Sequence, residues 1–401
     1  MKILIVTQRY WPESFRITDI AETLVKQGND VTVLTGLPNY PQGYIYDGYK
    51  HHKNRIEEHN GVKIIRAKEI ARRNNVLFRF FNYYSFPHYA KRIVKKLDKD
   101  FDVVLINELS PIMGAKPGLL YKKNYGTKVV MYEMDLWPES LLAGGIKKDS
   151  FLYKHYKKVS SKIYSKCDKI LVSTKEHINY IKALPECEKL DINYLPQYAE
   201  EIFEQVKPKE TKDGEIINLM FAGNIGKAQS VDTIIRAAAL LKDDKRFEFH
   251  IVGSGSEYDN VVTLSKQLDT SNVKFYGQKP VSEMPELYSK MDVMIVTLED
   301  SSYANLTIPG KIQSYLAAGK PIIGAINGST AEFIKEYQVG KVCSAGDFNG
   351  FANIFSNLDS NFINEASMKS KVLYNSMFKK DKFIWYVIST FFSLVMPNCC
   401  A

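Results

Sequence analysis

The sequence predicts an α/β protein built from two doubly wound, Rossmann-like domains that face a central cleft. The chain has 401 residues, too many for one ordinary hydrophobic core, so two domains are expected. Short apolar runs alternate with helix-length segments, which is the pattern of parallel strands joined by crossover helices. The alternation pauses once, over residues 198–215, a charged stretch with few apolar residues that we interpret as a linker.

The first domain is predicted over residues 1–200. Helices are predicted over 17–27, 86–97 and 150–166, and Gly28 is a typical residue to follow the end of the first of them. Its buried strands are predicted at 2–7, 30–35, 61–67, 102–107, 128–132, 169–173 and 193–195.

The second domain is predicted over residues 201–375, and a helical tail, 376–401, is predicted to pack back on the first domain. The most apolar part of the tail, 383–396, is too short to span a bilayer, which takes roughly 20 residues. The strands of the second domain are predicted at 217–222, 247–252, 273–276, 293–296, 321–326 and 341–343.

Charge is unevenly distributed along the chain. Residues 1–200 hold 33 Lys and Arg against 22 Asp and Glu, a balance of +11, whereas the remainder has 21 against 23, a balance of −2. Arginines and aromatic residues alternate over 71–86, and lysines follow at 91, 95 and 96. The first half is therefore expected to meet an anionic membrane surface. A solvated basic helix over core aromatics is the main alternative, and single-stranded nucleic acid is the weakest.

No cofactor and no metal are expected. The five cysteines have no metal-ligand spacing, which favours a reduced cytosol. The apolar run at the N-terminus is too short for a signal peptide. The loop after the first strand, residues 8–16, lacks the glycines with which a dinucleotide fold approaches a pyrophosphate.

Residues 305–323 form the most informative segment. A polar loop containing Thr307, Pro309 and Gly310 leads into a short helix that begins near Lys311 and includes Ser314. Backbone N–H groups, hydroxyls and a lysine at a helix start are suited to holding a diphosphate. Because charge builds on a departing diphosphate, Lys311 is also a candidate catalytic residue.

Other loops of the second domain follow predicted strands. Glycines let a backbone approach a ligand closely, and a nearby lysine adds positive charge. Gly277 and Gln278 could contact a base, although an ordinary turn explains them equally well. The candidate residues are Gly223, Asn224, Gly226, Lys227, Gly253, Gly255, Gly277 and Gln278.

In the first domain, carboxylates cluster after the strand that ends near residue 132. Asp135 is the leading candidate to accept a proton from an acceptor hydroxyl or to orient the acceptor, with Glu133 and Glu139 as alternatives. Further candidates for the acceptor side are arginines that could bind phosphate or carboxylate, and carboxylate, amide and aromatic side chains in neighbouring loops. These are Arg9, Glu13, Arg16, Asn39, Tyr40, Glu108 and Trp137.

These loops, in this order, resemble glycosyltransferase family 4, which has the two-domain GT-B fold, and most closely the WbuB-type enzymes of O-antigen and capsule synthesis. The matching segments are 11–20, 37–41, 135–140 and 223–226. The resemblance implies a retaining transfer of a sugar from a UDP-sugar to a lipid-linked saccharide at the cytoplasmic face of the plasma membrane. It also implies N-acetyl-L-fucosamine, or another N-acetylated amino sugar, as the donor sugar.

The chain departs from the family at charged positions. The two glutamates of a common Glu-x7-Glu pair fall at Leu306 and Ser314, the usual phosphate-loop Arg and Lys fall at Asn224 and Gln229, and a usual histidine falls at Met134. Lys227 and Lys311 can replace the lost phosphate-binding charge. A UDP-sugar epimerase of the same fold and a non-catalytic nucleotide-sugar-binding protein therefore stay open as alternatives.

Overall fold

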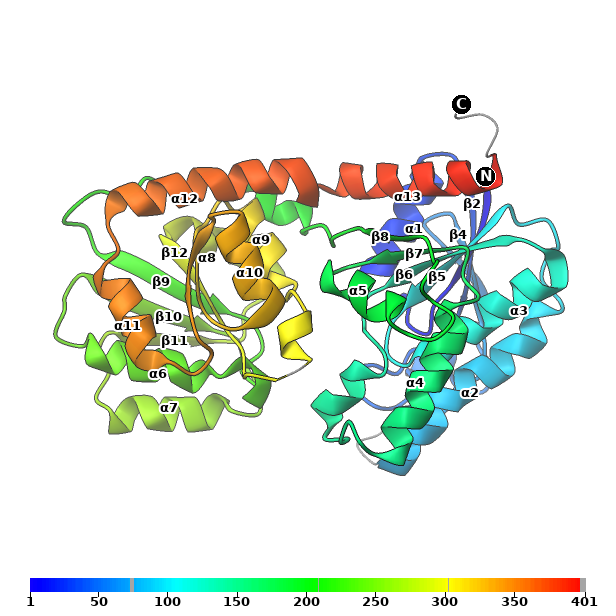
Figure 1. Ribbon diagram of the computed structural model, residues 1–401, viewed down its shortest axis with the longest axis horizontal. Coiled ribbons are helices and arrows are strands. Elements are labelled where there is room, and N and C mark those ends of the chain that lie inside the picture. Colours follow the sequence, from blue (N-terminus) through cyan, green and yellow to red (C-terminus); the bar gives the residue numbers. More distant parts are fainter. Residues whose placement is uncertain (73–75, 208, 302, 397–401) are drawn as a thin grey trace. The chain divides into compact units, whose positions relative to one another are not determined.

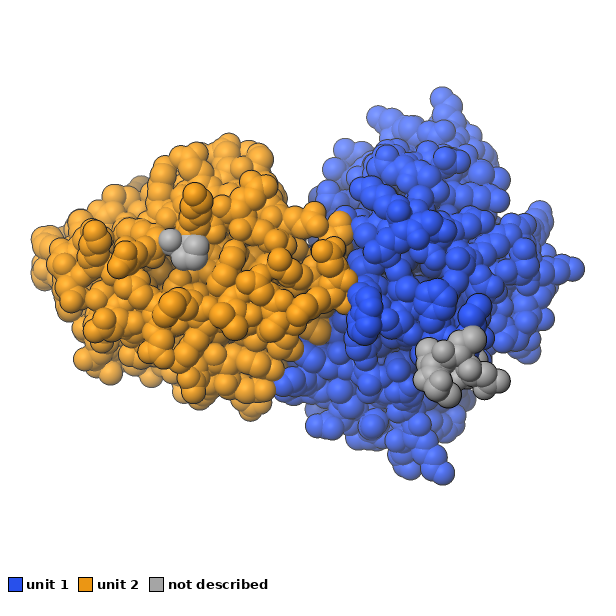
Figure 2. Space-filling model, turned by 90° about the horizontal axis from the view of Figure 1, so that it is seen from above, with its two compact units in different colours: residues 1–195, 384–401 blue, residues 196–383 orange. Residues whose placement is uncertain are grey.

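The computed structural model describes residues 1–72, 76–207, 209–301 and 303–396 (Figure 1). The chain forms two compact units, distinguished by colour in Figure 2: Met1–Leu195 with Ile384–Ala401, and Pro196–Phe383. The predicted domain boundary after residue 200 lies inside the second unit. The reason is that the segment after Leu195 contributes Ala199, Phe203 and Val206 to that unit's hydrophobic core.

The first unit contains an eight-stranded sheet in the order β3-β4-β2-β1-β5-β6-β7-β8. All neighbours pair in parallel except β3 with β4. The antiparallel edge strand β3 was not predicted, because its Glu57 and Glu58 interrupt any apolar run. The strands are β1 (Lys2–Val6), β2 (Asp30–Thr35), β3 (Ile56–His59), β4 (Val62–Arg66), β5 (Val103–Glu108), β6 (Lys128–Glu133), β7 (Lys169–Val172) and β8 (Ile192–Tyr194).

Helix α2 of the first unit differs most from its prediction. A helix was predicted over residues 86–97, but it begins at Val76, ends at Val94 and includes Pro87. Buried Asn82 and Phe86 anchor this earlier part. The helices are α1 (Arg16–Lys26), α2 (Val76–Val94), α3 (Lys116–Tyr125), α4 (Phe151–Tyr164) and α5 (Glu176–Lys182).

The second unit contains a six-stranded parallel sheet in the order β11-β10-β9-β12-β13-β14. Strands β9, β10 and β11 are parallel neighbours, so the loops that follow them lie beside one another at the carboxyl edge of the sheet. The direction in which strands are added reverses between β9 and β12, and doubly wound sheets bind ligands at such a point. The strands are β9 (Ile217–Ala222), β10 (Phe247–Val252), β11 (Val273–Gly277), β12 (Val293–Thr297), β13 (Ile322–Ala325) and β14 (Gly340–Cys343).

Helices pack on both faces of this sheet through two hydrophobic clusters. One cluster includes Tyr315 and Leu316 of α9, and the other includes Ile234 and Ile235 of α6. The helices are α6 (Val231–Leu240), α7 (Tyr258–Gln267), α8 (Met284–Lys290), α9 (Lys311–Ala317), α10 (Gly328–Glu336), α11 (Phe348–Ser356) and α12 (Ser360–Leu373).

The interpretation of residues 198–215 as a linker with few apolar anchors was wrong. A short 3-10 helix, η4 (Glu201–Gln205), forms there, and Phe203 stacks on Tyr288 with ring centroids 5.0 Å apart. The segment is charged on one side only, so its few apolar residues suffice to fix it to the core.

The C-terminal tail forms α13 (Lys380–Val395), which starts in the second unit and belongs to the first from Ile384 onward. Ile384, Val387 and Phe391 are buried, whereas Trp385 is exposed. Within the described ranges, no helix combines the length and the apolar character needed to cross a membrane.

Candidate active site

The second unit contains a cavity of about 390 Å³ at the carboxyl ends of β9, β10 and β11. Gly223 and Asn224 line it after β9, Gly253 and Ser254 after β10, and Gln278 after β11. Tyr288 of α8 contributes an aromatic wall. Three glycine-containing or polar loops therefore converge on one hollow, which the sequence predicted from their positions after strands.

The side-chain ammonium of Lys311 is the most unusual charge in this unit. Its Nζ is buried, has no hydrogen-bond partner in the described part of the chain, and lies 3.8 Å from the centroid of the Phe221 ring. Burial lowers the pKa of Lys311 from 10.5 to about 7. An unpaired buried ammonium is costly, and such strongly shifted groups concentrate at functional sites.

Lys311 faces the first glycine of the β9 loop. A Cβ placed on Gly223 would lie 2.9 Å from Lys311 Nζ, and Gly223 has a φ of +142°. Only glycine adopts this region readily and leaves the space open. An anionic group placed against the Gly223 backbone would thus reach the lysine that lacks a partner.

The β10 loop packs on the β9 loop so closely that it also requires glycine. A Cβ on Gly253 would lie 1.8 Å from the Gly223 carbonyl oxygen, and the φ of Gly253 is +139°. The Gly253 N–H donates to the Gly277 carbonyl at 2.8 Å, which joins all three loops. The predicted Gly255 lies nearby, where a Cβ would meet the Ile225 carbonyl at 2.4 Å.

Lys227 belongs to the short 3-10 helix Lys227–Gln229. It lines a cavity of about 370 Å³ together with Gly226, Glu257 and Glu299. That Lys227 and Lys311 share one diphosphate stays a prediction. Asn224 Nδ2 and the Gly226 N–H both donate to Gln229 Oε1, at 3.0 and 3.2 Å.

The loop before α9 is held by one hydroxyl of its own and by one from α10. Thr307 Oγ1 donates to the Ala304 carbonyl at 3.2 Å, and Thr330 Oγ1 donates to the Thr307 carbonyl at 2.9 Å. Pro309 and Gly310 complete the loop, and α9 then has only seven residues. The helix is too short for a strong dipole, so the anion-binding argument depends on Lys311 and the glycine loops.

Ser314 stands on α9 where the resemblance led us to expect a carboxylate. Its Oγ donates to Glu200 Oε2 at 3.1 Å. A carboxylate thus does reach this place, but from a residue over a hundred positions earlier. No pattern in the sequence connects Glu200 with Ser314, because the contact depends on how residues 196–206 fold against α9.

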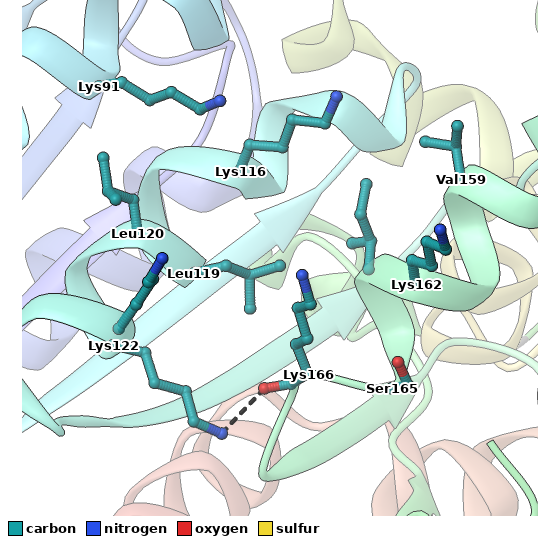
Figure 3. A pocket seen from close by; sticks show the side chains of 11 residues that line it. Lys91, Lys116, Leu119, Leu120, Lys122, Val159, Lys162, Ser165 and Lys166 are labelled. Atoms are coloured by element: carbon teal, nitrogen blue, oxygen red, sulfur yellow. Dashed lines mark hydrogen bonds between the residues drawn. The ribbon is translucent and has the colours of Figure 1, made fainter. Parts of the chain in front are cut away.

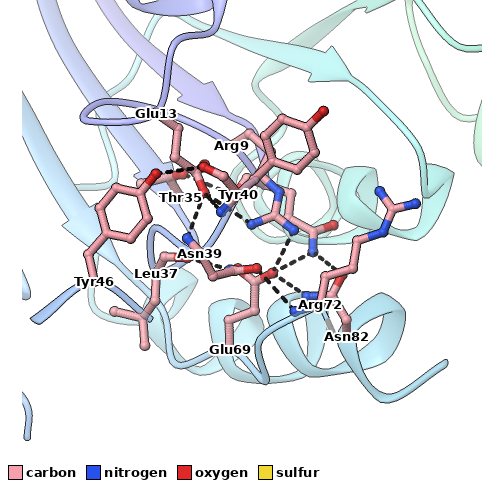
Figure 4. Close-up of polar contacts among 12 residues, drawn as sticks. Arg9, Glu13, Thr35, Leu37, Asn39, Tyr40, Tyr46, Glu69, Arg72 and Asn82 are labelled. Carbon is pink, nitrogen blue, oxygen red and sulfur yellow. Dashed lines mark hydrogen bonds and ion pairs between the residues drawn. The ribbon is translucent and has the colours of Figure 1, made fainter. Parts of the chain in front are cut away.

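In the first unit, Arg9 and Glu13 belong to a buried polar network at the carboxyl ends of β1, β2 and β4 (Figure 4). Arg9 Nη1 lies 3.4 Å from Glu13 Oε1, and Arg9 Nη2 lies 3.4 Å from Glu69 Oε1. Glu69 Oε1 also accepts from Gln8 Nε2 at 2.8 Å and from Asn82 Nδ2 at 2.5 Å. Arg9 is therefore committed to partners inside the fold, rather than presented to an acceptor as predicted.

Glu13 ties the β1 loop to the β2 loop. Its Oε1 accepts the backbone N–H groups of Asn39 and Tyr40, both at 2.6 Å (Figure 4). Asn39 is itself buried, and its Oδ1 accepts from the Arg72 N–H at 3.1 Å. This network holds the exposed Tyr40 in place, with its ring 5.6 Å from that of Phe15. Of the predicted acceptor-side residues, Tyr40 and the partly exposed Arg16 reach the surface.

The carboxylates after β5 and β6 occupy different environments. Glu133 is fully buried, and its Oε2 lies 2.7 Å from Nδ1 of His177. Asp135 is partly exposed, and its Oδ2 accepts the Ser110 N–H at 3.1 Å. Glu139, the other alternative, is buried and accepts a hydrogen bond from the Tyr153 hydroxyl. Exposure therefore favours Asp135 over both alternatives for contact with an acceptor.

Glu108 and Trp137 lie in the interior, contrary to their predicted places on the acceptor side. Burial raises the pKa of the Glu108 carboxyl well above 4.5, and the charges of Glu133 and Asp135 raise it further. Trp137 is fully buried, donates from Nε1 to Ser110 Oγ at 2.9 Å, and packs on the rings of Tyr83 and Tyr156. Both follow strand ends, but their side chains point inward.

Part of this chain matches a protein family, and longer parts are similar to known proteins. Residues 217–361 match the family described as Glycosyl transferases group 1. The chain is 27% identical over 254 residues to the probable glycosyltransferase WbjE of Pseudomonas aeruginosa, an alignment that spans 59% of this chain and 62% of WbjE. It is 24% identical to the putative colanic acid biosynthesis glycosyl transferase WcaI of Escherichia coli, over 88% of each chain.

The fold is that of a GT-B glycosyltransferase. Among solved structures, sucrose-phosphate synthase from Thermosynechococcus elongatus superposes with a TM-score of 0.72 at 14% identity, covering 99% of this chain and all of that one. HepE of Anabaena, solved in complex with UDP, gives a TM-score of 0.71 at 14% identity and covers 98% of this chain and 100% of its own. The predicted GT-B fold is thus confirmed, and so is the predicted enzyme class, glycosyltransferase.

Sequence reasoning missed two buried residues of the first unit. Glu69 follows β4, and His177 follows β7, so the rule that ligands and polar groups gather at strand carboxyl ends could have found both. Neither residue belongs to a sequence motif. Each stands out only in the folded structure, through a partner that is distant in the sequence.

Proposed function

We propose that this chain is a retaining glycosyltransferase that moves a sugar from a UDP-sugar to a lipid-linked saccharide. The observation that carries the proposal is the buried Lys311 Nζ, which has no hydrogen-bond partner in the described residues and lies beside Gly223, a residue that lines the cavity. A ligand that supplies negative charge at this place would satisfy the ammonium and stabilise the folded protein. The diphosphate of a nucleotide sugar has the charge and reach to do so.

The donor side is assigned to the second unit. The diphosphate would lie against the Gly223 backbone within reach of Lys311, with the nucleoside toward Gln278 and Tyr288. UDP is favoured as the nucleotide because HepE was solved with UDP. Lys311 would neutralise charge that builds on the leaving diphosphate, so catalysis would need no metal.

The acceptor side is assigned to the first unit, with Asp135 as the residue that orients the acceptor hydroxyl. In a retaining transfer by front-face attack, the bond from the anomeric carbon to the diphosphate oxygen breaks. The acceptor oxygen bonds to the same face of that carbon, and its proton passes to the leaving phosphate oxygen. Asp135 would hold the hydroxyl in position for this step rather than form a covalent intermediate.

The biological setting is proposed from the relatives. Colanic acid synthesis in the name of WcaI and teichuronic acid synthesis in that of TuaH of Bacillus subtilis favour a role in bacterial surface polysaccharides, such as O-antigen or capsule. The relation to WbuB-type enzymes and N-acetyl-L-fucosamine as the sugar stay predictions. A lipid-linked acceptor would place the protein at the cytoplasmic face of the plasma membrane, where its basic first half would meet anionic lipid.

The test is release of UDP from a panel of UDP-sugars, with and without lipid-linked saccharide extracts. A transferase releases UDP in proportion to the glycosylated product, whose anomeric configuration is then read by NMR. Asp135→Asn should lower turnover at least about tenfold with UDP binding intact, as expected when a positioning group for the hydroxyl is lost. Conversion of the UDP-sugar without UDP release would identify an epimerase instead. Binding without any turnover would identify a non-catalytic protein.

A further inference from the structure

The first unit contains a second hollow, of about 650 Å³, on the outside of the sheet between α2, α3 and α4 (Figure 3). Six lysines surround it, and no acidic side chain lines it among the residues the structure describes. Its floor is apolar and includes Leu119, Leu120 and Ile163. The lysines are Lys91, Lys116, Lys122, Lys123, Lys162 and Lys166.

The positive charge in this hollow is poorly compensated. Asp168, at its margin, pairs with Lys122 at 2.7 Å and with Lys128 at 3.4 Å. Lys116 is half-buried, and its pKa is lowered by burial first and by the charge of Lys91 second. Like charges repel one another, so an anion placed among these lysines would stabilise their protonated forms.

An aromatic surface continues from this hollow toward the N-terminal ends of α2 and α4. Lys116 Nζ lies 5.8 Å from the centroid of the Tyr84 ring, and the Phe80 ring lies 4.9 Å from the same ring. The hydroxyls of Tyr84 and Tyr156 are 2.9 Å apart, which joins α2 to α4.

Both helices expose apolar side chains near their N-terminal ends. Phe151 is 86% exposed at the start of α4, beside the exposed Leu152, and Phe80 and Phe81 are about half exposed on α2. Exposure of this much aromatic surface to water is unfavourable unless a partner covers it.

We propose that the face formed by α2, α3 and α4 docks onto an anionic lipid bilayer. Phospholipid headgroups occupy the lysine hollow, acyl chains contact its apolar floor, and Phe80, Phe81, Phe151 and Leu152 enter the interfacial region. The inference deepens the proposed function, on which it rests for the lipid anchor of the acceptor, by naming the surface that meets the membrane.

The combination of groups favours a bilayer over other anions. A free phosphate would use the lysines and leave the leucine floor and the exposed phenylalanines in water. A single-stranded nucleic acid would need its aromatic stacking partners within the basic groove, but these phenylalanines lie at the helix ends beyond it. Lysines next to interfacial aromatic and aliphatic residues are the arrangement that anionic membranes recruit.

The test is sedimentation of the full chain with vesicles of phosphatidylcholine, with and without about one third phosphatidylglycerol. The double variant Lys91→Gln/Lys162→Gln should weaken binding to the anionic vesicles about 30-fold, since each lysine near such a surface contributes about 1 kcal/mol. The control Lys245→Gln/Lys266→Gln makes the same charge change at two exposed lysines of the second unit and should leave binding unchanged. Phe151→Ser/Leu152→Ser should also weaken binding, by about tenfold or more.

The proposal would be overturned if the pocket variant, Lys91→Gln/Lys162→Gln, and the control variant bound anionic vesicles with equal affinity. Retention of a fluorescent oligonucleotide, lost in the pocket variant, without any vesicle binding would overturn it in favour of nucleic acid. Each variant must keep its thermal unfolding transition and its response to UDP, which shows that it has folded. Since vesicle binding needs neither donor nor turnover, its failure is distinct from failure of the proposed transferase activity.

Discussion

Replacement of Lys311 by methionine should make the unliganded protein more stable and weaken its response to UDP. In the unfolded chain this lysine has a pKa of 10.5, and burial lowers its pKa to about 7 in the folded protein. Because each pKa unit corresponds to about 1.4 kcal/mol, holding Lys311 in its buried place costs the fold about 4 kcal/mol at neutral pH. Methionine fills a similar space beside Phe221 without that cost.

The sign of the pH effect follows from the same shift. Between about pH 7 and 10.5 the unfolded chain binds a proton at Lys311 that the folded protein does not, so the stability of the unliganded protein rises with pH through this window. The variant Lys311→Met should lack this rise. Its melting temperature at neutral pH should exceed that of the wild type by about 8–16 °C, since about 1 kcal/mol shifts a domain of this size by about 2–4 °C.

The assay is thermal unfolding with and without saturating UDP. The wild type should gain stability with UDP, whereas Lys311→Met should lose about 10–100-fold in affinity, as expected for loss of a charged hydrogen bond. Lys320→Met is the matched control. Lys320 is also buried, with a pKa lowered to about 8, but its Nζ donates to the Met291 carbonyl at 2.6 Å. Unlike Lys311, it has no atom within 4 Å of a Cβ placed on Gly223. A Lys311→Met protein that is less stable without ligand, or that keeps the full UDP response, would refute this reasoning.

Three further predictions concern the same two units. Affinity for UDP, measured by calorimetry, should fall by about tenfold per pH unit above about pH 7, because binding must then protonate Lys311; a flat profile would contradict its role. Gly253→Ala should lower the melting temperature far more than Gly214→Ala, because a Cβ at position 253 would lie 1.8 Å from a carbonyl oxygen. Gly214 is the control: its φ is also positive, +85°, but a Cβ there would meet nothing within 4 Å. Equal losses of melting temperature would mean that the loops repack freely. Glu108→Gln should raise the melting temperature increasingly as pH rises above 4.5, because the folded protein holds a proton on Glu108 that the unfolded chain releases; a constant difference would show that Glu108 is ionised in the fold.

Features encoded by local pattern were readable from the sequence. Strands that are buried on both faces appear as apolar runs, and the helices between them follow from their periodicity. The Gly223, Gly253 and Lys311 loops were found because each directly follows a strand or precedes a helix, and parallel strands bring such loops to one edge. The edge strand β3 and the true start of α2 were missed, because their residues are chosen by tertiary contacts rather than by periodicity.

What only the tertiary structure decided is which polar groups face a ligand and which face one another. Arg9 and Glu13 were both predicted to lie on the acceptor side, but the fold gives them Glu69 and the β2 loop as partners. Trp137 and Glu108 follow strand ends and yet point inward. Lys227 and Lys311 look equivalent as phosphate ligands, yet only Lys311 reaches Gly223. The physical reason is that a side chain's charge and solvation are set by neighbours distant in sequence, whereas strands and turns are set by residues next to one another.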